Sequence, residues 1–237
     1  MFKFMYIKKI IIFFSKFVIN KIFFFRSIKN YLKILSGKNI NNFYLPNILI
    51  KNIIFINPSK IKYKGNANMK FKKKTTLFIT NLDTDKNNIE MYKFENEHHS
   101  YVTCNQLFVK NFQIKECKEY FFFKKQIEKF GEYKGCKTDH DINLYFKKLL
   151  NLFEIIKKNG IKTNIDNNLD FMIDRNNNLV KINGGNHRFA ISRILKLKKI
   201  PVEIKLISSQ SLNKSYKEKI NIKELHYCIK NIEQKYN

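Results

Sequence analysis

The chain has no tryptophan, and its 4 cysteines are scattered rather than paired. Cys104, Cys117, Cys136 and Cys228 include no Cys-x-x-Cys pair, the spacing that zinc sites typically use. A zinc site is therefore not expected. Nothing suggests an export cleavage site, and scattered cysteines are typical of reduced cytoplasmic thiols buried as small apolar groups.

Acidic residues are scarce, because 19 Asp and Glu stand against 46 Lys and Arg and give a formal net charge of +27. Such an excess suggests an anionic partner, which would be nucleic acid, acidic lipid or a nucleotide. The alternative is compositional bias, since a chain rich in Lys, Asn, Ile and Phe and free of Trp is what an AT-rich coding sequence produces. The sequence leaves both explanations open.

The chain also lacks a long uninterrupted apolar run. Residues 4–25 are the most apolar stretch, but their longest unbroken run, residues 10–14, is far below the about 20 residues that cross a bilayer. On a helical wheel most polar residues of this stretch gather on one side, and they are Lys8, Lys9, Ser15, Lys16 and Asn20. We predict a basic amphipathic helix lying on the inner membrane face, within an N-terminal segment 1–37. Packing on the folded domain and a true membrane anchor are the alternatives.

With 44% hydrophobic residues, the 237-residue chain has enough apolar material for a core and suits one domain with an extension. The polar, proline-containing stretch 39–47 is the expected boundary after the N-terminal segment. Beyond it we expect lead-in strands and a helix in 48–135, an α/β core in 136–207, and a C-terminal loop and helix in 208–237. Strands are expected at 48–56, 75–80, 179–182 and 202–207.

Helical spacing of apolar residues predicts three helices in the second half of the chain, at 115–129, 141–158 and 221–235. In the first, the predicted apolar face includes Cys117, Phe121 and Phe130. Thr138 and Asp141 have the spacing of a capping box at the start of the second. The adjacent pair His98-His99 is predicted to lie on an extended segment, where neighbouring side chains point to opposite sides, so a metal site there is not favoured.

The stretch with most chemical content is Gly184-Gly185-Asn186-His187-Arg188, between a short buried strand and a helix. Glycines at such a junction let the backbone approach a ligand and leave amide groups unpaired. Those amides and the positive end of the helix dipole favour an anion, and His187 and Arg188 in the first turn can add donors. The alternative is that the glycines only allow close packing of strand and helix, with His187 and Arg188 paired on the surface.

This motif, followed by Ile200-Pro-Val-Glu-Ile204, resembles the ParB/sulfiredoxin-like domain, whose signature is a strand, Gly-x-His-Arg, a helix and an Ile-Pro-Val strand. The entry into that domain, a helix and then Asn-Gly-Ile, is similar to the stretch ending at Asn159-Gly160-Ile161. The resemblance covers residues 143–207. It implies an α/β (α+β) fold with a small mixed sheet and packed helices. It also implies a nucleotide triphosphate or diphosphate (ATP, ADP or CTP), with Mg²⁺, bound at Gly184–Arg188.

The chain departs from the members of known chemistry. Sulfiredoxins carry a reactive cysteine where this chain has Asn186, and a carboxamide cannot replace a thiolate nucleophile. Free-serine kinases of the same fold carry an aspartate where this chain has Gly184, so a phosphotransfer reaction needs another carboxylate. Asp170, Asp174 and Glu203 are the nearest in sequence, although Glu203 also fits a solvated strand residue. The candidate catalytic residues are therefore His187, Asp174 and Glu203.

Chromosome-partition proteins of the family use several arginines at this turn, of which the chain keeps only Arg188, and too few residues follow 207 for a DNA-reading helix-turn-helix. From residue 114 onward the chain also resembles ParB-like proteins associated with surface-polysaccharide pathways. The favoured expectation is a nucleotide-binding, kinase-like phosphotransferase acting on a small molecule or surface-glycan precursor, cytoplasmic and peripheral on the inner membrane face. A non-catalytic nucleotide-responsive module and a nucleic-acid-binding protein are the alternatives.

Overall fold

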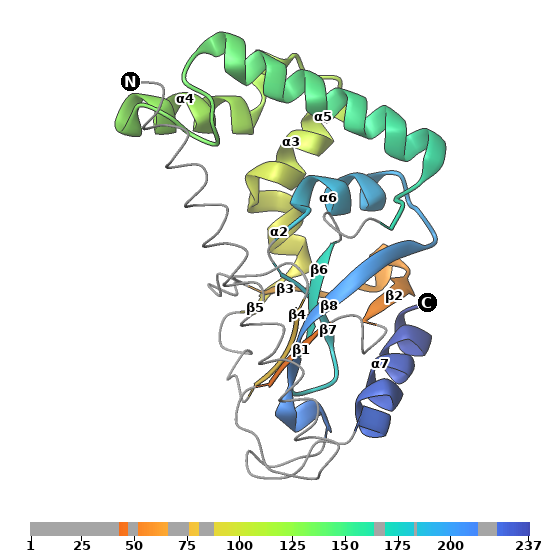
Figure 1. The fold of residues 1–237 in the computed structure, drawn as a ribbon. Coiled ribbons are helices and arrows are strands. Elements are labelled where there is room, and N and C mark those ends of the chain that lie inside the picture. Colours follow the sequence, from red (N-terminus) through yellow and green to blue (C-terminus); the bar gives the residue numbers. More distant parts are fainter. Residues whose placement is uncertain are drawn as a thin grey trace, which may run out of the picture.

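The computed structural model describes residues 43–46, 52–65, 76–80, 88–163, 169–182, 184–212 and 222–237. In these residues the protein has the mixed α/β fold class that the sequence predicts, with a sheet lobe below a lobe of helices (Figure 1). The amphipathic helix predicted within residues 1–37 lies outside the described residues. No helix in the described part of the chain is both long and apolar enough to cross a membrane.

The sheet is organised around β8 (Ile200–Ser208), whose nine residues are all buried. One edge of β8 pairs antiparallel with β2 (Ile53–Ile56) and then parallel with β4 (Thr76–Thr80). The opposite edge pairs parallel with β6 (Asp170–Ile173). Because both edges of β8 are paired and both of its faces are covered, most of its residues are apolar. The Ile-Pro-Val segment was recognisable as a strand for this reason.

The other described strands extend the sheet in the order β1-β4-β8-β6-β7-β3-β5. They are β1 (Phe43–Pro46), β7 (Leu179–Lys181), β3 (Tyr63–Gly65) and β5 (Asn88–Glu90). The predictions at 75–80, 179–182 and 202–207 are confirmed to within two residues, and the described part of 48–56 is the strand β2. The expectation that 39–47 is only a connection is wrong, because β1 pairs there with β4.

The helical lobe consists of three helices, reached from the sheet through the short helix α2 (Met91–Glu97). They are α3 (His99–Phe108), α4 (Lys118–Phe130) and α5 (Asp139–Asn159). The predicted capping box is confirmed, because the Asp141 amide donates to Thr138 Oγ1 at 3.2 Å and the Thr138 amide donates to Asp141 Oδ2 at 3.0 Å. Gly131, in the left-handed region at φ 77°, ends α4.

The predicted apolar face of α4 is wrong, because it is displaced by about one residue from the face that the helix buries. Phe121 and Phe130 are 61% and 62% exposed, whereas Tyr120 and Phe123 are buried. Three consecutive phenylalanines on a helix point in three directions, so only one of them can lie at the centre of the buried face. Periodicity alone does not decide which one that is.

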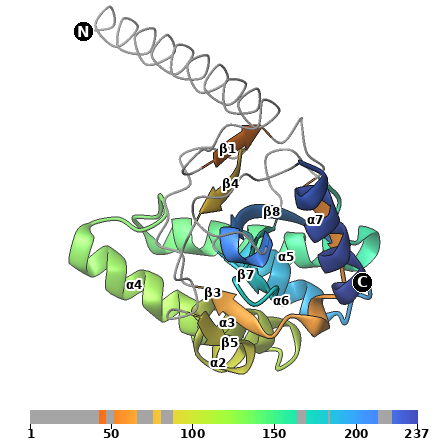
Figure 2. The same ribbon diagram turned by 90° about the horizontal axis from the view of Figure 1, so that it is seen from below.

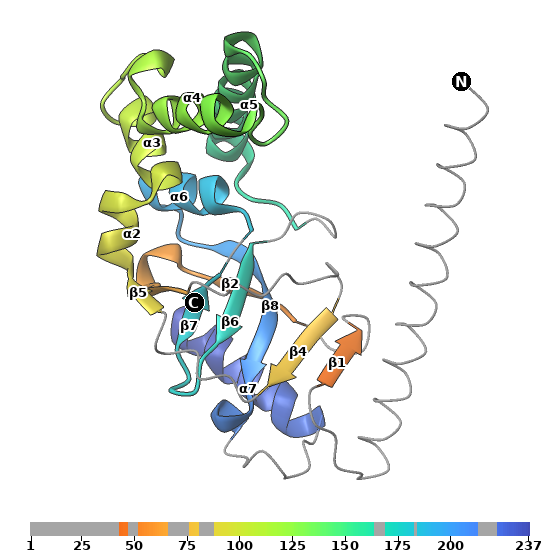
Figure 3. The same cartoon turned by 90° about the vertical axis from the view of Figure 1, so that its left-hand side faces the viewer.

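Helix α6 (Asn186–Ile194) belongs to both lobes. Phe189 packs into the core of the sheet lobe, with its ring centroid 5.7 Å from that of Phe171, while Ala190 and Ile191 lie in the core of the helical lobe. The predicted C-terminal helix is α7 (Ile222–Tyr236), which packs against β2 on the side away from α4 (Figure 2). Figure 3 shows α6 lying between the sheet and the pair α4 and α5.

Replacing Phe123 by Ala is expected to lower the free energy of unfolding by about 3–5 kcal/mol, because the ring is fully buried and its loss leaves a cavity. The matched change Phe121→Ala, on the exposed face of the same helix, should cost no more than about 0.5 kcal/mol. Urea unfolding followed by circular dichroism measures both values. Similar losses in the two variants would contradict the assignment of the buried face.

Candidate functional site

The turn before α6 has the geometry that the sequence predicts. Gly184 and Gly185 both lie in the left-handed region, with φ of 93° and 68°, and Gly185 is the N-cap of the helix. His187 and Arg188 therefore stand in the first helical turn, as expected. The amide groups of Asn186, His187 and Arg188 donate to no acceptor among the described residues. These three amides lie at the positive end of the helix dipole and can bind an anion.

The two glycines also allow close packing, as the alternative interpretation proposed. A Cβ atom on Gly184 would lie 2.3 Å from Asp170 Oδ2, and one on Gly185 would lie 2.5 Å from Leu169 Cδ2. The backbone of the turn thus rests directly on the start of β6. Close packing is compatible with an anion site here, because the packing involves the Cα side of the turn and not the first-turn amides.

A buried lysine holds the turn against β6. Lys181 is fully buried, and its ammonium group donates to the backbone carbonyls of Ile182 and Gly184 and, at 3.4 Å, to that of Asp170. Burial lowers the pKa of Lys181 well below the usual lysine value, while the three carbonyl acceptors favour the charged form. Lys181 was not among the predicted site residues, although a lysine inside a short apolar strand is itself a signal.

Asp170 and Glu203 lie next to each other beside this turn. They face each other across the parallel pairing of β6 and β8. Burial raises the pKa of Asp170, with the charges of Lys181 and Lys205 acting in the opposite direction. Of the candidate carboxylates, these two are therefore near Gly184.

The interpretation of Glu203 as a solvated strand residue is wrong. Glu203 is 3% exposed and forms an ion pair with Lys205, which is equally buried. Every residue of β8 is buried, so both faces of the strand are covered and alternation leads to solvent on neither side. Glu203 and Lys205 are two positions apart and so share a face, where they meet, and Asn52 Nδ2 adds a contact of 3.4 Å to Glu203 Oε1.

Asp174 lies at the opposite end of β6. Its Oδ1 accepts hydrogen bonds from the amides of Asn176 at 2.9 Å and Asn178 at 2.7 Å, so the carboxylate closes the turn between β6 and β7. At about 3.3 Å per residue, four residues along the strand separate Asp174 from Asp170 by about 13 Å. The structure does not bring Asp174 and His187 together.

His187 instead contacts a carboxylate that the sequence analysis did not single out. His187 Nε2 lies 2.7 Å from Oε2 of Glu119, which stands in the first turn of α4 and is fully buried. The Tyr145 hydroxyl donates to Glu119 Oε1 at 3.1 Å. His99 Nε2 and Lys134 Nζ lie 3.6 and 3.5 Å from the same oxygen. We call Glu119, His187, Tyr145, His99 and Lys134 the glutamate cluster.

The electrostatics of the glutamate cluster favour an ionised Glu119. Burial alone would raise the pKa of Glu119, but the hydrogen bond from His187 and the electrostatic influence of His187, Lys134 and His99 outweigh it, and the pKa lies below its ordinary value. Glu119 lies four residues before the buried Phe123 and so on the buried face of α4, which periodicity alone did not identify. A carboxylate on an apolar face needs partners.

The prediction of an extended segment at His98-His99 is wrong. His98 ends α2 and caps α3, because its Nδ1 accepts from the Ser100 amide at 3.3 Å, and the two imidazole rings stack with centroids 4.5 Å apart. Burial, and then the neighbouring His99, lower the pKa of His98 to about 3. The described residues contain no group of three or more His, Cys, Asp or Glu side chains placed to hold a metal ion.

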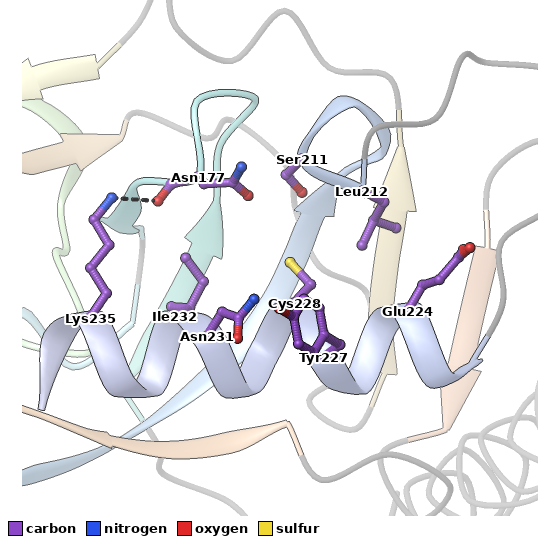
Figure 4. A pocket seen from close by; sticks show the side chains of 9 residues that line it. All are labelled: Asn177, Ser211, Leu212, Glu224, Tyr227, Cys228, Asn231, Ile232 and Lys235. Atoms are coloured by element: carbon purple, nitrogen blue, oxygen red, sulfur yellow. Dashed lines mark hydrogen bonds between the residues drawn. The ribbon is translucent and has the colours of Figure 1, made fainter.

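A separate pocket of about 500 Å³ lies between α7 and the turn that joins β6 to β7. Figure 4 shows Asn177, Ser211 and Cys228 among its lining residues, with Lys235 donating to the Asn177 carbonyl at 3.0 Å. None of the predicted site residues lines it. Because Asn177 belongs to the hairpin turn, the pocket lies at the end of β6 opposite to Gly184.

The substitution Gly184→Ala is expected to destabilise the fold, because the new Cβ meets the Asp170 carboxylate at an unfavourable positive φ. Gly131→Ala is the matched control, since Gly131 has a similar φ of 77° but no atom within 4 Å of the position that a Cβ would take. We expect the Gly131 variant to lose about 1–2 kcal/mol from backbone strain and the Gly184 variant to lose more. Equal losses in thermal unfolding would contradict the close contact with β6.

The stability of the fold is expected to depend on the ionisation of Glu119. Its folded pKa lies below the ordinary value, so the carboxylate stabilises the fold above that ordinary value, and the stabilisation is lost as the pH falls through the folded pKa. Glu119→Gln should cost about 1.5–3 kcal/mol at neutral pH, and less as the pH falls toward about 3. Urea unfolding across this range tests the sign, with the exposed Glu128→Gln as control. A difference that does not shrink in acid would contradict it.

Comparisons with known proteins gave no match, whether to a protein-family model, to a curated protein or to a solved structure. The residues of the turn and the glutamate cluster, and their geometry, are therefore the basis for a functional conclusion.

Proposed function

We propose that the protein binds the phosphate groups of a nucleotide at Gly184–Arg188. The observation that carries this proposal is the set of three first-turn amides of α6, which have no acceptor among the described residues and stand behind a glycine turn. Amides at a helix N-terminus bind phosphate because the backbone donors and the helix dipole act together. A helix of nine residues, Asn186–Ile194, is long enough to contribute such a dipole.

Two side chains of the turn support an anionic ligand. The Arg188 guanidinium folds back over the turn, since its Nη2 lies 3.1 Å from the position that a Cβ of Gly185 would take. The side-chain oxygen Oδ1 of Asn186 is buried and has no hydrogen-bond partner in the described structure. A ligand that carries both a phosphate and a hydroxyl or amino group, as a nucleotide does, could bond to the amides and to this oxygen.

The order of the elements also supports nucleotide binding, but less directly than the amides and side chains of the turn. A strand, a glycine turn, a helix and an Ile-Pro-Val strand follow one another as β7, Gly184–Gly185, α6 and β8. That is the order in the ParB/sulfiredoxin-like signature, in which the resemblance implies bound ATP, ADP or CTP. Likeness at the level of the fold does not define the chemistry. Which nucleotide binds is therefore decided by the binding experiment below.

The fit to Mg²⁺ rests on Asp170. Glu203 is engaged by Lys205, whereas Asp170 is partly exposed and lies against Gly184. Mg²⁺ in nucleotide sites is usually held by one or two carboxylates together with the phosphates. Asp170 would be the residue of this chain that holds the ion, and the ion would neutralise charge on the phosphates.

A second candidate function is phosphotransfer to a small molecule or surface-glycan precursor. It is favoured by one observation, the contact of 2.7 Å between His187 in the turn and the buried Glu119. A carboxylate–imidazole pair beside a phosphate site provides a base for a reacting hydroxyl. A non-catalytic nucleotide-responsive module would bind the same ligand without turnover.

The test is a thermal-shift screen of ATP, ADP, CTP and GTP with Mg²⁺. A nucleotide at about 100 times its Kd should stabilise the fold by about 2.7 kcal/mol. Arg188→Ala should weaken binding about ten- to hundredfold, because it removes charge-assisted hydrogen bonds to phosphate. The control is Arg175→Ala, which changes an exposed arginine in the hairpin turn at the other end of β6. No stabilisation by any nucleotide, or equal binding by the two variants, would contradict the proposal.

A further inference from the structure

The glutamate cluster brings together groups from both lobes around one carboxylate. His99 comes from α3, Tyr145 from α5, and Lys134 from the connection between α4 and α5, while His187 comes from the first turn of α6. A fully buried carboxylate is costly unless several donors satisfy it. Only one of these donors, His187, also belongs to the proposed phosphate site. Glu119 is thus linked to that site through a single imidazole ring.

The contact with Glu119 selects one tautomer of His187. A carboxylate oxygen only accepts hydrogen bonds, so at 2.7 Å the proton of the neutral ring must be on Nε2. The other nitrogen, Nδ1, then carries a lone pair. No described residue forms a hydrogen bond with Nδ1, and the His187 side chain is 18% exposed. A substrate group can therefore reach the unoccupied nitrogen.

His187 also contributes its backbone to the proposed phosphate site. His187 is the second residue of α6, and its own amide is one of the three donors that have no acceptor among the described residues. A base and an anion-binding amide thus belong to the same residue. This arrangement suits a reaction in which a nucleophile loses a proton while it attacks a phosphorus atom held at the helix N-terminus.

We propose that His187 Nδ1 is the general base for phosphoryl transfer to a hydroxyl acceptor, and that Glu119 is the positioning residue that fixes the ring. This rests on the proposed nucleotide site. The acceptor oxygen forms a bond to the terminal phosphorus as the bridging P–O bond breaks, and the electron pair of that bond leaves with the nucleotide product. The acceptor proton moves to Nδ1, which produces an imidazolium ion paired with the Glu119 carboxylate.

The class of acceptor follows from the need for a base. An alcohol keeps its proton at neutral pH and reacts better when a base removes it in the transition state, whereas a carboxylate or phosphate acceptor is already ionised. We therefore assign a hydroxyl-bearing small molecule to this site. Water is the simplest member of the class and serves as the probe acceptor below.

The tautomer is tested without any assay of activity. Long-range ¹H–¹⁵N spectra of the ¹⁵N-histidine-labelled protein show which ring nitrogen carries the proton, and His187→Gln identifies the resonance. We expect the neutral ring of His187 to carry its proton on Nε2 in the native protein and in Glu128→Gln. In Glu119→Gln we expect this preference to weaken. A proton on Nδ1 in the native protein would overturn the proposal.

The reaction is tested with Mg-ATP and Mg-ADP, with water as acceptor. Glu119→Gln should lower kcat about 100-fold with KM for the nucleotide changed less than about twofold, and it should move the acidic limb of the kcat–pH profile. His187→Gln should lower kcat at least as much. This variant tests the proposal even if Glu119→Gln does not fold. Glu128→Gln should match the native protein.

The outcomes separate this proposal from the one on which it rests. If the native protein binds no nucleotide, the proposed phosphate site itself is wrong. Nucleotide binding without hydrolysis, or an unchanged kcat in a folded Glu119→Gln or His187→Gln variant, overturns the general-base role and leaves the binding site standing. A purely structural Glu119 would lower the melting temperature without changing the pH profile of kcat.

Discussion

The buried contact between Glu119 and His187 is the interaction on which the arrangement of the site depends. It joins the first turn of α4 to the first turn of α6, and so connects the helical lobe to the turn that follows β7. A buried carboxylate is unfavourable unless several donors satisfy it, and His187 is the donor that α6 contributes. The imidazole is therefore held where α6 packs against the helical lobe.

The residues at the two ends of β6 have different roles. At its start, Lys181, Asp170 and the glycine turn form a closely packed junction of charged groups beside the first turn of α6. At its end, Asp174 caps a hairpin turn and contributes to folding rather than to the junction. The same residue type thus has two roles that depend on which end of the strand it occupies, and sequence distance to the motif is a poor guide to proximity.

Local patterns predicted much of the fold. The capping box at Thr138 and the glycine turn before α6 depend on backbone groups within a few residues, and the sequence contains all of them. The burial of Glu203 could not be predicted from alternation, because both faces of β8 are covered and its alternate side chains reach solvent on neither side. Glu119 was missed for a related reason, since its partners come from α3, α5 and α6, and a single sequence does not pair distant segments.

The most direct measurement of the central claim is amide NMR during a titration with inorganic tripolyphosphate and Mg²⁺. We expect saturable shifts of the backbone amides of Asn186, His187 and Arg188, since these donors would gain an acceptor. Shifts confined to lysine-rich surface segments, with these three amides unchanged at saturation, would contradict the account.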